Sequence, residues 1–385
     1  GSFGHVLLLR VCLSMFTRPP ISTLVPSATH FRSVPYAHGK YYDSRSKVNI
    51  PQNRVIPIDD QFGFNPSMGP VKSLWDEGKV AIVNGIGYEN PNRSHFRSMD
   101  IWHTAEPNAI GKEGWLARAI RDIDPLGENV LTGINFGRGL PRALACPGVS
   151  VASVGDLETY GLFPDVQDEE LRMFTLEAFS RMYGNVAGRD PIMDLMGRTG
   201  QDALQGADIL RTAPGMYSSS VEYAPNSLAQ NVKSLSQVFH ANLGARVLYT
   251  QHGPFDTHSG ELATHAKLWD DVAGAIGCLM DDLKEHGTEE DATILVFSEF
   301  GRRIKDNGSG SDHGSGGVAF MIGGAVNGGM YGEYPSLSEA EQIEGDLRAN
   351  NDFRSVYTEI LEDWLELDAP SIVNGQFEKL GILQS

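Results

Sequence analysis

Short apolar runs alternate along this chain with longer segments in which apolar residues recur every three or four positions. The runs "VAIVNGIGY", "ARVLYTQHG", "ATILVFSEF" and "GVAFMIGGAV" are apolar on both sides, as in strands that are covered by helices on two faces. The segment "SGELATHAKLWDDVAGAIGCLMDDLKEHG" has the spacing of a long helix. This alternation predicts an α/β fold, a three-layer α/β/α sandwich around a mostly parallel central sheet.

The pattern also predicts how the chain is divided. Residues 1–33 form an irregular N-terminal segment, in which "HVLLLRVCLSMF" fits a first buried strand and the rest fits a loop. Residues 34–385 are expected to form a single α/β domain. Within it, residues from about 165 to 242 are mostly helical and predict a lid-like insertion. Its "MFTLEAF" and "PIMDLMG" runs are expected to face the core, with an apolar substrate pocket as the alternative.

Composition narrows the possible partners. The chain has 385 residues, of which 41% are hydrophobic, and a formal net charge of −18. Such an acidic surface repels phosphate backbones, so nucleic acid is not an expected partner, and an anionic membrane surface is disfavoured as well. An anionic substrate would need local positive charge, supplied by a metal ion or by arginine side chains. No apolar run reaches 18 residues, and the three cysteines form no CxxC pair. Nothing in the pattern indicates an oligomeric state.

Candidate catalytic and metal-binding residues occur in three loops at the ends of predicted strands. The first of these loops is "NPNRSHFR". Ser94 stands near the start of a helix, where unpaired amide groups favour an anion or an alkoxide. Arg93 and Arg97 add donors suited to phosphate, sulfate or carboxylate oxygens. The alternative interpretation is that Ser94, or Asn92 before it, is simply a helix N-cap.

The second loop is "QHGPFDTHSG". Asp256 and His258 are two positions apart, so in an extended segment they point to the same side. A carboxylate and an imidazole placed in this way are half of a metal site. His252 could lie close to them. His265 shares a helical stripe with apolar residues and is expected to be a packed histidine.

The third loop is "SEFGRRIKDNGSGSDHG". Glu299 ends a buried strand, where a charged residue needs a partner or a metal, and Arg302 or Arg303 could be that partner. A glycine- and serine-rich turn then leads to Asp312 and His313. Oxygen and imidazole ligands together suit zinc, manganese, iron or magnesium better than copper(I).

The motifs "NPNRSHFRSMDIWHTA", "FDTHSGELATHAKLWDDV" and "VFSEFGRRIKDNGSGSDHGSGG" resemble the bacterial family called domain of unknown function 1501. That family is related to sulfatases and the alkaline phosphatase superfamily. The resemblance implies an alkaline phosphatase-like fold with a nucleophilic serine at a helix start, beside metals held by Asp and His. By position it makes Ser94 the nucleophile, with Arg93, His95 and His313 around it. Its metal ligands would be Asp256, His258, Glu299, Asp312 and His313.

The chain departs from the superfamily pattern in two places. Superfamily members carry an Asp just after the first strand, whereas "LLLRVCLSMFTRPP" contains no acid. The motif "SEF" also lacks the histidine of the usual Asp-His pair. One divalent metal (zinc, manganese, magnesium or calcium) is therefore expected rather than two, and a site without metal is an alternative.

Three hypotheses for function follow. The first is a hydrolase of a small-molecule phosphate or sulfate ester that uses Ser94 and a divalent metal. The second is a metal-independent carboxylic esterase in which a histidine (His313, His258 or His95) activates Ser94, although the G-x-S-x-G elbow is absent. The third is a non-catalytic binding protein on a degenerate hydrolase scaffold. The family resemblance further implies export, although no signal peptide is visible in this sequence.

Overall fold

The computed structural model describes residues 5–10, 34–157, 159–160, 168–184, 191–299 and 301–384. The predicted irregular stretch after the first strand, residues 11–33, lies outside the described residues. No helix in the described ranges combines the length and the apolar character needed to cross a membrane.

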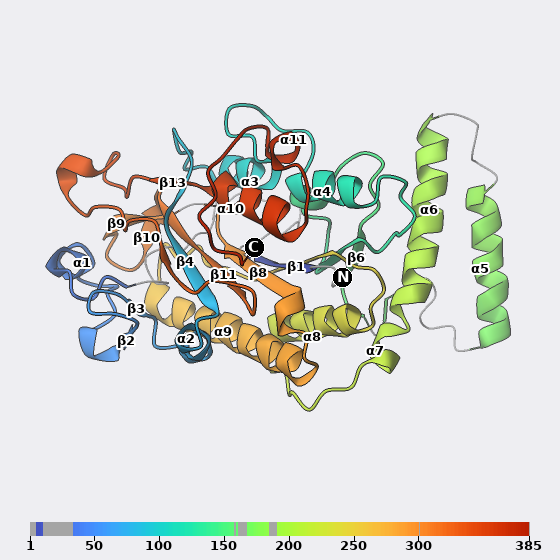
Figure 1. The fold of residues 1–385 in the computed structure, drawn as a ribbon, viewed down its shortest axis with the longest axis horizontal. Helices are drawn as coiled ribbons and strands as arrows, with labels where there is room; N and C mark the ends of the chain where they lie inside the picture. The colour runs from blue at the N-terminus through green and yellow to red at the C-terminus, as the bar shows by residue number, and fades with distance from the viewer. Residues whose placement is uncertain are drawn as a thin grey trace.

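A nine-stranded mixed sheet forms the centre of the molecule, with the strand order β12-β4-β11-β8-β1-β7-β5-β6 and β13 paired to β4 (Figure 1). Its strands are β1 His5–Arg10, β4 Val80–Gly87, β5 Gly133–Phe136, β6 Ala152–Val154, β7 Val247–Gln251, β8 Ala292–Phe297, β11 Gly317–Gly323, β12 Gly329–Tyr331 and β13 Asn351–Asp352. The first apolar run thus supplies β1, which pairs in parallel with β7 and β8. One strand breaks the predicted parallel arrangement, because β11 runs antiparallel to β4 and β8.

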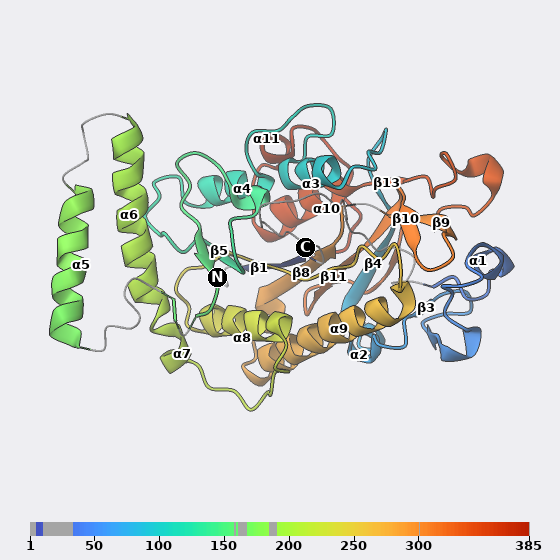
Figure 2. The same ribbon diagram turned by 180° about the vertical axis from the view of Figure 1, so that it is seen from behind.

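Helices cover both faces of this sheet. In Figures 1 and 2, α3, α4, α10 and α11 lie on one side, and α2, α8 and α9 lie on the other. The helix bounds are α1 Gly39–Ser44, α2 Gly69–Asp76, α3 His95–Thr104, α4 Trp115–Ile123, α5 Glu169–Gly184, α6 Pro191–Leu210, α7 Ala213–Met216, α8 Ser227–His240, α9 Glu261–Glu285, α10 Phe353–Glu359 and α11 Ala369–Val373. Short 3-10 turns occupy Gln52–Arg54, Arg142–Leu144, Glu289–Asp291 and Glu339–Glu341, and a π-helical segment occupies Ile360–Trp364.

The alternating side chains of the strands divide the interior into two cores. Ile294 and Val296 of β8 pack with α2, α8 and α9, whereas Leu295 and Phe297 pack with α3, α4, α10 and α11. Successive residues of a strand point to opposite faces, so a strand that is apolar throughout must be covered twice. The doubly apolar runs of the sequence therefore correspond to a sheet buried between two helical layers.

Two small hairpins lie outside the main sheet. Strands β2 (Ile56–Pro57) and β3 (Gly63–Phe64) pair with each other, and β9 (Arg302–Asp306) pairs with β10 (Ser311–His313). The second hairpin is the glycine- and serine-rich stretch noted in the sequence. Its antiparallel register sets His313 opposite Arg302, directly before β11 returns to the central sheet.

The helical insertion does not lie over the β9–β10 hairpin. Helices α5 and α6 stand at the end of the molecule opposite to β9 and β10, and both views agree on this placement (Figures 1 and 2). Met173 and Phe174, which the sequence pattern assigned to the core or a substrate pocket, are 60% and 70% exposed. Among the described elements, only α6 packs extensively against α5. The other sides of α5 therefore remain uncovered by the described chain.

Candidate active site

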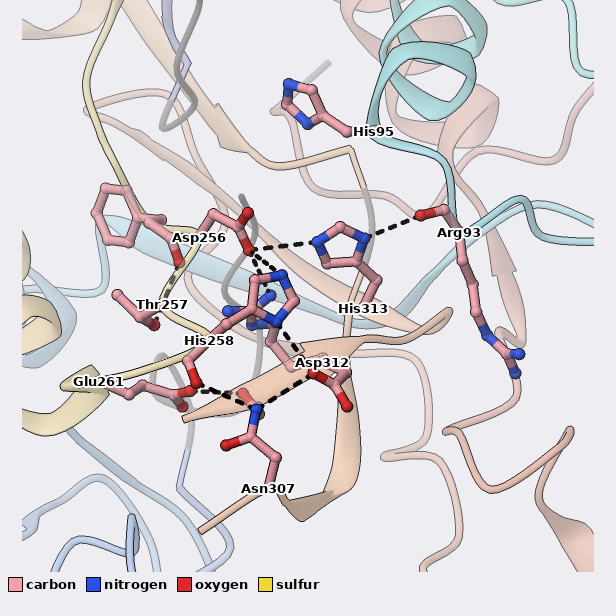
Figure 3. A network of polar contacts seen from close by, with 12 residues as sticks. Arg93, His95, Asp256, Thr257, His258, Glu261, Asn307, Asp312 and His313 are labelled. Carbon is pink, nitrogen blue, oxygen red and sulfur yellow. Dashed lines mark hydrogen bonds and ion pairs between the residues drawn. The ribbon is translucent and has the colours of Figure 1, made fainter. Parts of the chain in front are cut away.

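The three candidate loops meet at one edge of the central sheet. Ser94 follows β4 and is the N-cap of α3, Asp256 and His258 lie between β7 and α9, and Glu299 follows β8. His313 ends β10. Parallel strands such as β7 and β8 bring the loops at their carboxyl ends together, which is why residues far apart in sequence become neighbours here. The structure brings Asp256, His258 and His313 into a single cluster (Figure 3).

One oxygen of Asp256 is the centre of this cluster. Its Oδ1 lies 3.0 Å from Nε2 of His258 and 3.2 Å from Nε2 of His313. The Nη1 atom of Arg302, a fully buried side chain, also lies 3.0 Å from it. The other oxygen, Oδ2, is buried and accepts no hydrogen bond from the described part of the chain. Asp256 thus keeps acceptor capacity that the described residues do not fill.

The outer nitrogens of the two histidines are already engaged. His313 Nδ1 lies 2.9 Å from the backbone oxygen of Arg93, and His258 Nδ1 lies 3.0 Å from Oδ1 of Asp312. A carbonyl oxygen can only accept, so the Nδ1 of His313 must carry a proton and donate it. With Nδ1 protonated, a neutral imidazole has a lone pair on Nε2. Both lone pairs would then point at Asp256, an arrangement that requires added positive charge between them.

A divalent cation fits this donor set. Two imidazole nitrogens and one carboxylate oxygen lie within 4.8 Å of one another, and three such protein ligands are typical of catalytic zinc sites. The outer contacts also match, because metal-bound histidines usually donate their other N–H to a carboxylate or a carbonyl. The unfilled Oδ2 of Asp256 supports the same conclusion. The alternative, two protonated histidines beside Arg302, would place three cations around one carboxylate oxygen.

The surroundings of Asp256 and of the neighbouring Asp312 favour the ionised form of both carboxylates. While no cation is bound, burial alone would raise the pKa of Asp256, but a hydrogen bond from His313 and the charges of His313, Arg302 and His258 outweigh it and lower the pKa. For Asp312, burial likewise acts to raise the pKa, and contacts with His258 and Asn307 lower it below the usual range. Ionised carboxylates are the form that binds metal, so no proton has to be displaced from them at neutral pH.

Buried polar contacts hold the β9–β10 hairpin and the loop between β7 and α9 in place. The hydroxyl of Ser311 donates to Oε2 of Glu261 at 2.6 Å, which ties β10 to the start of α9, and Arg45 lies 3.4 Å from the same carboxylate. His265 is fully buried and contacts the Thr257 hydroxyl at 2.7 Å. It is therefore the packed histidine that its helical position predicted. Arg45 and Glu261 were missed from the sequence, because no local motif marks two residues 216 positions apart.

Two residues predicted as metal ligands have other partners. Asp312 contacts the outer nitrogen of His258, so the His258 ring stands between it and Asp256. Glu299 is fully buried, and its Oε1 lies 2.6 Å from Nδ1 of His95, the first residue of α3. His95 itself stands apart from the Asp256 cluster (Figure 3). The Glu299–His95 pair therefore joins the end of β8 to the start of α3, next to Ser94.

The side chain of Arg93 is turned away from the cluster (Figure 3). Its guanidinium contacts Asp346 at 2.7 Å and Glu344 at 2.9 Å. Arg97 likewise contacts Asp100 at 2.6 Å, and it donates to backbone oxygens of the following loop. In this arrangement Arg93 contributes to the cluster through its backbone oxygen. The two arginines that the sequence offered as anion donors are thus engaged in holding loops.

For the ester hydrolysis and metal binding that the sequence leads us to expect, Glu299→Gln should lower kcat by about tenfold to 100-fold without reducing bound metal. The glutamine keeps the shape but removes the charge that holds His95 and the start of α3, an effect comparable to losing an outer partner. Metal content and steady-state kinetics of the same preparation measure both quantities. Loss of metal in this variant would instead make Glu299 a ligand, as its position in the sequence first indicated.

A second His–Asp–His cluster lies away from this edge, at the C-terminal ends of α8 and α9. The Asp282 Oδ2 atom accepts from Ser236, Tyr217 and Tyr223 at 2.6 to 2.8 Å. His286 lies with Nδ1 2.8 Å from the backbone oxygen of Asp282 and with Nε2 3.1 Å from that of Ser218. Both nitrogens face backbone oxygens, which can only accept, and both distances are those of hydrogen bonds. A protonated His286, which carries an N–H on each nitrogen, can therefore donate to both oxygens.

The stability contributed by His286 is expected to fall as pH rises. The backbone oxygen of Asp282 raises the pKa of His286 against the effect of burial, with help from Ser218 and Glu285. A group whose pKa is raised by folding stabilises the protein fully below its ordinary value and loses that contribution above the folded value. His286→Gln should therefore cost about 1 kcal/mol near pH 5.5 and less near pH 9.

Urea unfolding of wild type and variant at both pH values measures this difference. The groups that face His286 are Asp282 and Glu285 on its own helix, His240 on α8, whose ring centroid lies 4.0 Å away, and the Tyr217 ring. His240→Gln is the matched control, because burial lowers the pKa of His240 and its effect should not shrink at high pH. An equal cost of His286→Gln at the two pH values would show that the imidazolium is not needed.

Comparison with solved structures finds remote similarities, among them a sulfatase, a protein solved with a neocarrahexaose and a phosphonate monoester hydrolase. The PsFucS1 sulfatase from Pseudoalteromonas sp. has 12% sequence identity, with 100% of this chain and 74% of that chain covered and a TM-score of 0.41. Ps i-CgsB, solved with k-i-k-neocarrahexaose, has 10% identity, coverage of 98% and 75%, and a TM-score of 0.43. The phosphonate monoester hydrolase SpPMH from Silicibacter pomeroyi has 11% identity, coverage of 80% and 70%, and a TM-score of 0.37.

Residues 177–352 match the family described as "Protein of unknown function (DUF1501)". The matched range, which is less than half of the chain, agrees with the family that the motifs resemble and contains Asp256, His258 and His313. No curated protein matches the sequence. Because the structural similarities are remote, the geometry of the site is the basis for a function.

Proposed function

We propose that this protein is a metal-dependent hydrolase of sulfate or phosphate esters. Asp256, His258 and His313 would hold one divalent cation, and Ser94 would be the nucleophile. The observation that carries the proposal is the convergence of two imidazole Nε2 atoms on Asp256 Oδ1, while both outer Nδ1 atoms have acceptors of their own. A carboxylate faced by two lone pairs is a binding site for a cation.

Each residue of the site would have a defined task. A divalent cation bound there would lower the pKa of a hydroxyl and offset charge on the transferring group. Asp312 and the backbone oxygen of Arg93 orient the two histidines. Ser94 lies at the N-terminus of α3, whose unpaired amide groups favour negative charge on its oxygen. The Glu299–His95 pair would be a positioning device that fixes this helix start against the sheet.

The covalent step can then be written in full. The Ser94 hydroxyl loses its proton to water, and its Oγ forms a bond to the phosphorus or sulfur of the ester. The bond to the leaving alcohol breaks, and the alcohol oxygen takes a proton from water. A second water then hydrolyses the Ser94 ester and frees the serine. Nucleophile, metal ligands and the buried Arg302 would all act from loops at one sheet edge.

One observation favours a second candidate, a metal-independent carboxylic esterase. Glu299 and His95 form a close carboxylate–imidazole pair beside Ser94, and such a pair could activate a serine hydroxyl. His313 is less suited to that role, because its Nε2, the nitrogen that would take the serine proton, lies 3.2 Å from Oδ1 of Asp256. In this mechanism Glu299→Gln would abolish activity and a chelator would have no effect.

A chelator experiment on an ester panel separates the two candidates. The protein is assayed with aryl sulfate, aryl phosphate and short-chain aryl carboxylate esters, before and after treatment with a chelator and after readdition of Zn²⁺ or Mn²⁺. Hydrolysis of the sulfate or phosphate ester that is lost with the chelator and restored by metal supports the proposal. Hydrolysis of the carboxylate ester alone, unchanged by the chelator, supports the esterase. No turnover of any ester contradicts both.

A further inference from the structure

Exposed apolar side chains are concentrated on the α5–α6 hairpin. Of the eleven large hydrophobic residues that are exposed in the described chain, five lie on these two helices: Leu171, Met173, Phe174, Met182 and Met196. Single exposed apolar residues are normal on a protein surface, but a group on one small element marks an interaction site. The group is also far from the candidate active site, at the opposite end of the molecule (Figures 1 and 2).

A groove lies between the two helices, and its apolar lining residues are here called its floor and its acidic lining residues its rim. It encloses about 770 Å³ and is lined by apolar side chains, among them Met173, Phe174, Leu176 and Leu204. The charged groups that line it are Glu170 and Glu177 on α5 and Asp208 on α6. No lysine or arginine is among the described residues that line the groove. Arg181 lies beside Glu177, but both side chains are more than half exposed, so water weakens that pair.

We propose that this groove binds a basic amphipathic helix of another protein. Carboxylates on the rim would pair with its lysines or arginines, and the floor would take its apolar face. Helices bind in apolar grooves through side chains spaced three, four and seven positions apart. Glu170, Phe174 and Glu177 lie four and three positions apart along α5, so they share the face of this helix that lines the groove. The flexible side chain of Met173 would let the floor adapt to the partner.

Charge makes the other occupants of an apolar surface less suitable. A second copy of the chain would bring an identical acidic groove, and each chain carries a net charge of −18. An anionic membrane would be repelled in the same way. A cationic helix instead gains attraction from every carboxylate on the rim and covers the apolar side chains at once.

Fluorescence anisotropy with a labelled model peptide tests the proposal on the full chain. The probe is an 18-residue amphipathic helix made of lysine and leucine, and the control probe replaces each lysine by glutamate. We expect the basic peptide to bind, with an affinity that falls as salt rises, and the acidic peptide not to bind. Phe174→Ser should weaken binding by about tenfold or more, because a large apolar contact is lost. Leu126→Ser is the matched control, since Leu126 is 80% exposed elsewhere.

A charge variant tests the rim separately. The triple variant Glu170→Gln, Glu177→Gln and Asp208→Asn should weaken binding and reduce its salt dependence. Its control neutralises Glu333, Glu341 and Glu378, which are exposed and lie on other parts of the chain. Equal binding by the two triple variants, or by Phe174→Ser and wild type, would overturn the proposal. A dimer of the protein alone that dissociates in Phe174→Ser would show a second copy as the occupant and would overturn it as well.

Discussion

Asp256→Asn should abolish metal binding and lower kcat/KM for ester hydrolysis by on the order of 10³-fold. Its Oδ1 is the point at which both histidine Nε2 atoms and Arg302 meet, so the charge of this one side chain organises the cluster. Loss of an outer partner of a metal ligand typically costs 10–100-fold, and loss of a direct ligand is expected to cost more. Asparagine keeps the size of the side chain but removes the negative charge.

Asp312→Asn provides the graded comparison for that variant. Within the Asp256 cluster Asp312 contacts only the outer nitrogen of His258, and it is about half exposed, so its loss should weaken metal binding by about 10–100-fold without abolishing it. Steady-state kinetics at saturating and limiting metal distinguish the two variants. The assignment of ligands would fail if Asp256→Asn bound metal as tightly as wild type, or if Asp312→Asn were the more severe change.

Ser94→Ala should lower kcat for the same ester by about 10⁴-fold and leave bound metal unchanged. Among the described residues, Ser94 makes no hydrogen bond with Asp256, His258 or His313. It lies exposed at the start of α3, where its backbone N–H donates to Asn92. The variant therefore removes a nucleophile without disturbing the Asp256 cluster. Circular dichroism and metal content establish that the protein is otherwise intact.

Ser98→Ala is a suitable control for that prediction. The Ser98 hydroxyl contacts Tyr88 and is buried on the same helix, so its loss should change stability more than chemistry. Ser94→Thr retains a hydroxyl and should keep part of the activity. Undiminished hydrolysis by Ser94→Ala would show that another group, or water itself, attacks the ester.

Much of the fold could be predicted because its determinants are local. A strand such as Ala292–Phe297 is apolar at every position, which indicates burial on both faces, and the long helix Glu261–Glu285 has its own period. The pair Asp256 and His258 was recognisable for the same reason, since two residues of an extended loop share one side. The direction of β11 was not predictable in this way, because an apolar run reads the same in a parallel and an antiparallel strand.

The partners of the site residues depend on long-range packing. Nothing near Glu299 in the sequence distinguishes a metal ligand from a partner of His95, which is 204 positions away. Similarly, the guanidinium of Arg93 donates to Asp346, which is 253 positions away, and therefore points away from the Asp256 cluster. The core position expected for Met173 and Phe174 was wrong, because helical spacing shows that a face is apolar but does not show what covers it.

Metal titration calorimetry of the chelator-treated protein tests the central claim most directly. Wild type is compared with a His258→Gln/His313→Gln double variant and with a His240→Gln/His286→Gln double variant, which removes two histidines from the second cluster instead. The proposed site predicts about one equivalent of Zn²⁺ or Mn²⁺ bound by wild type and by the second variant, and none by the first. Absence of binding to wild type, or binding that is lost only with His240 and His286, would contradict a metal site at Asp256.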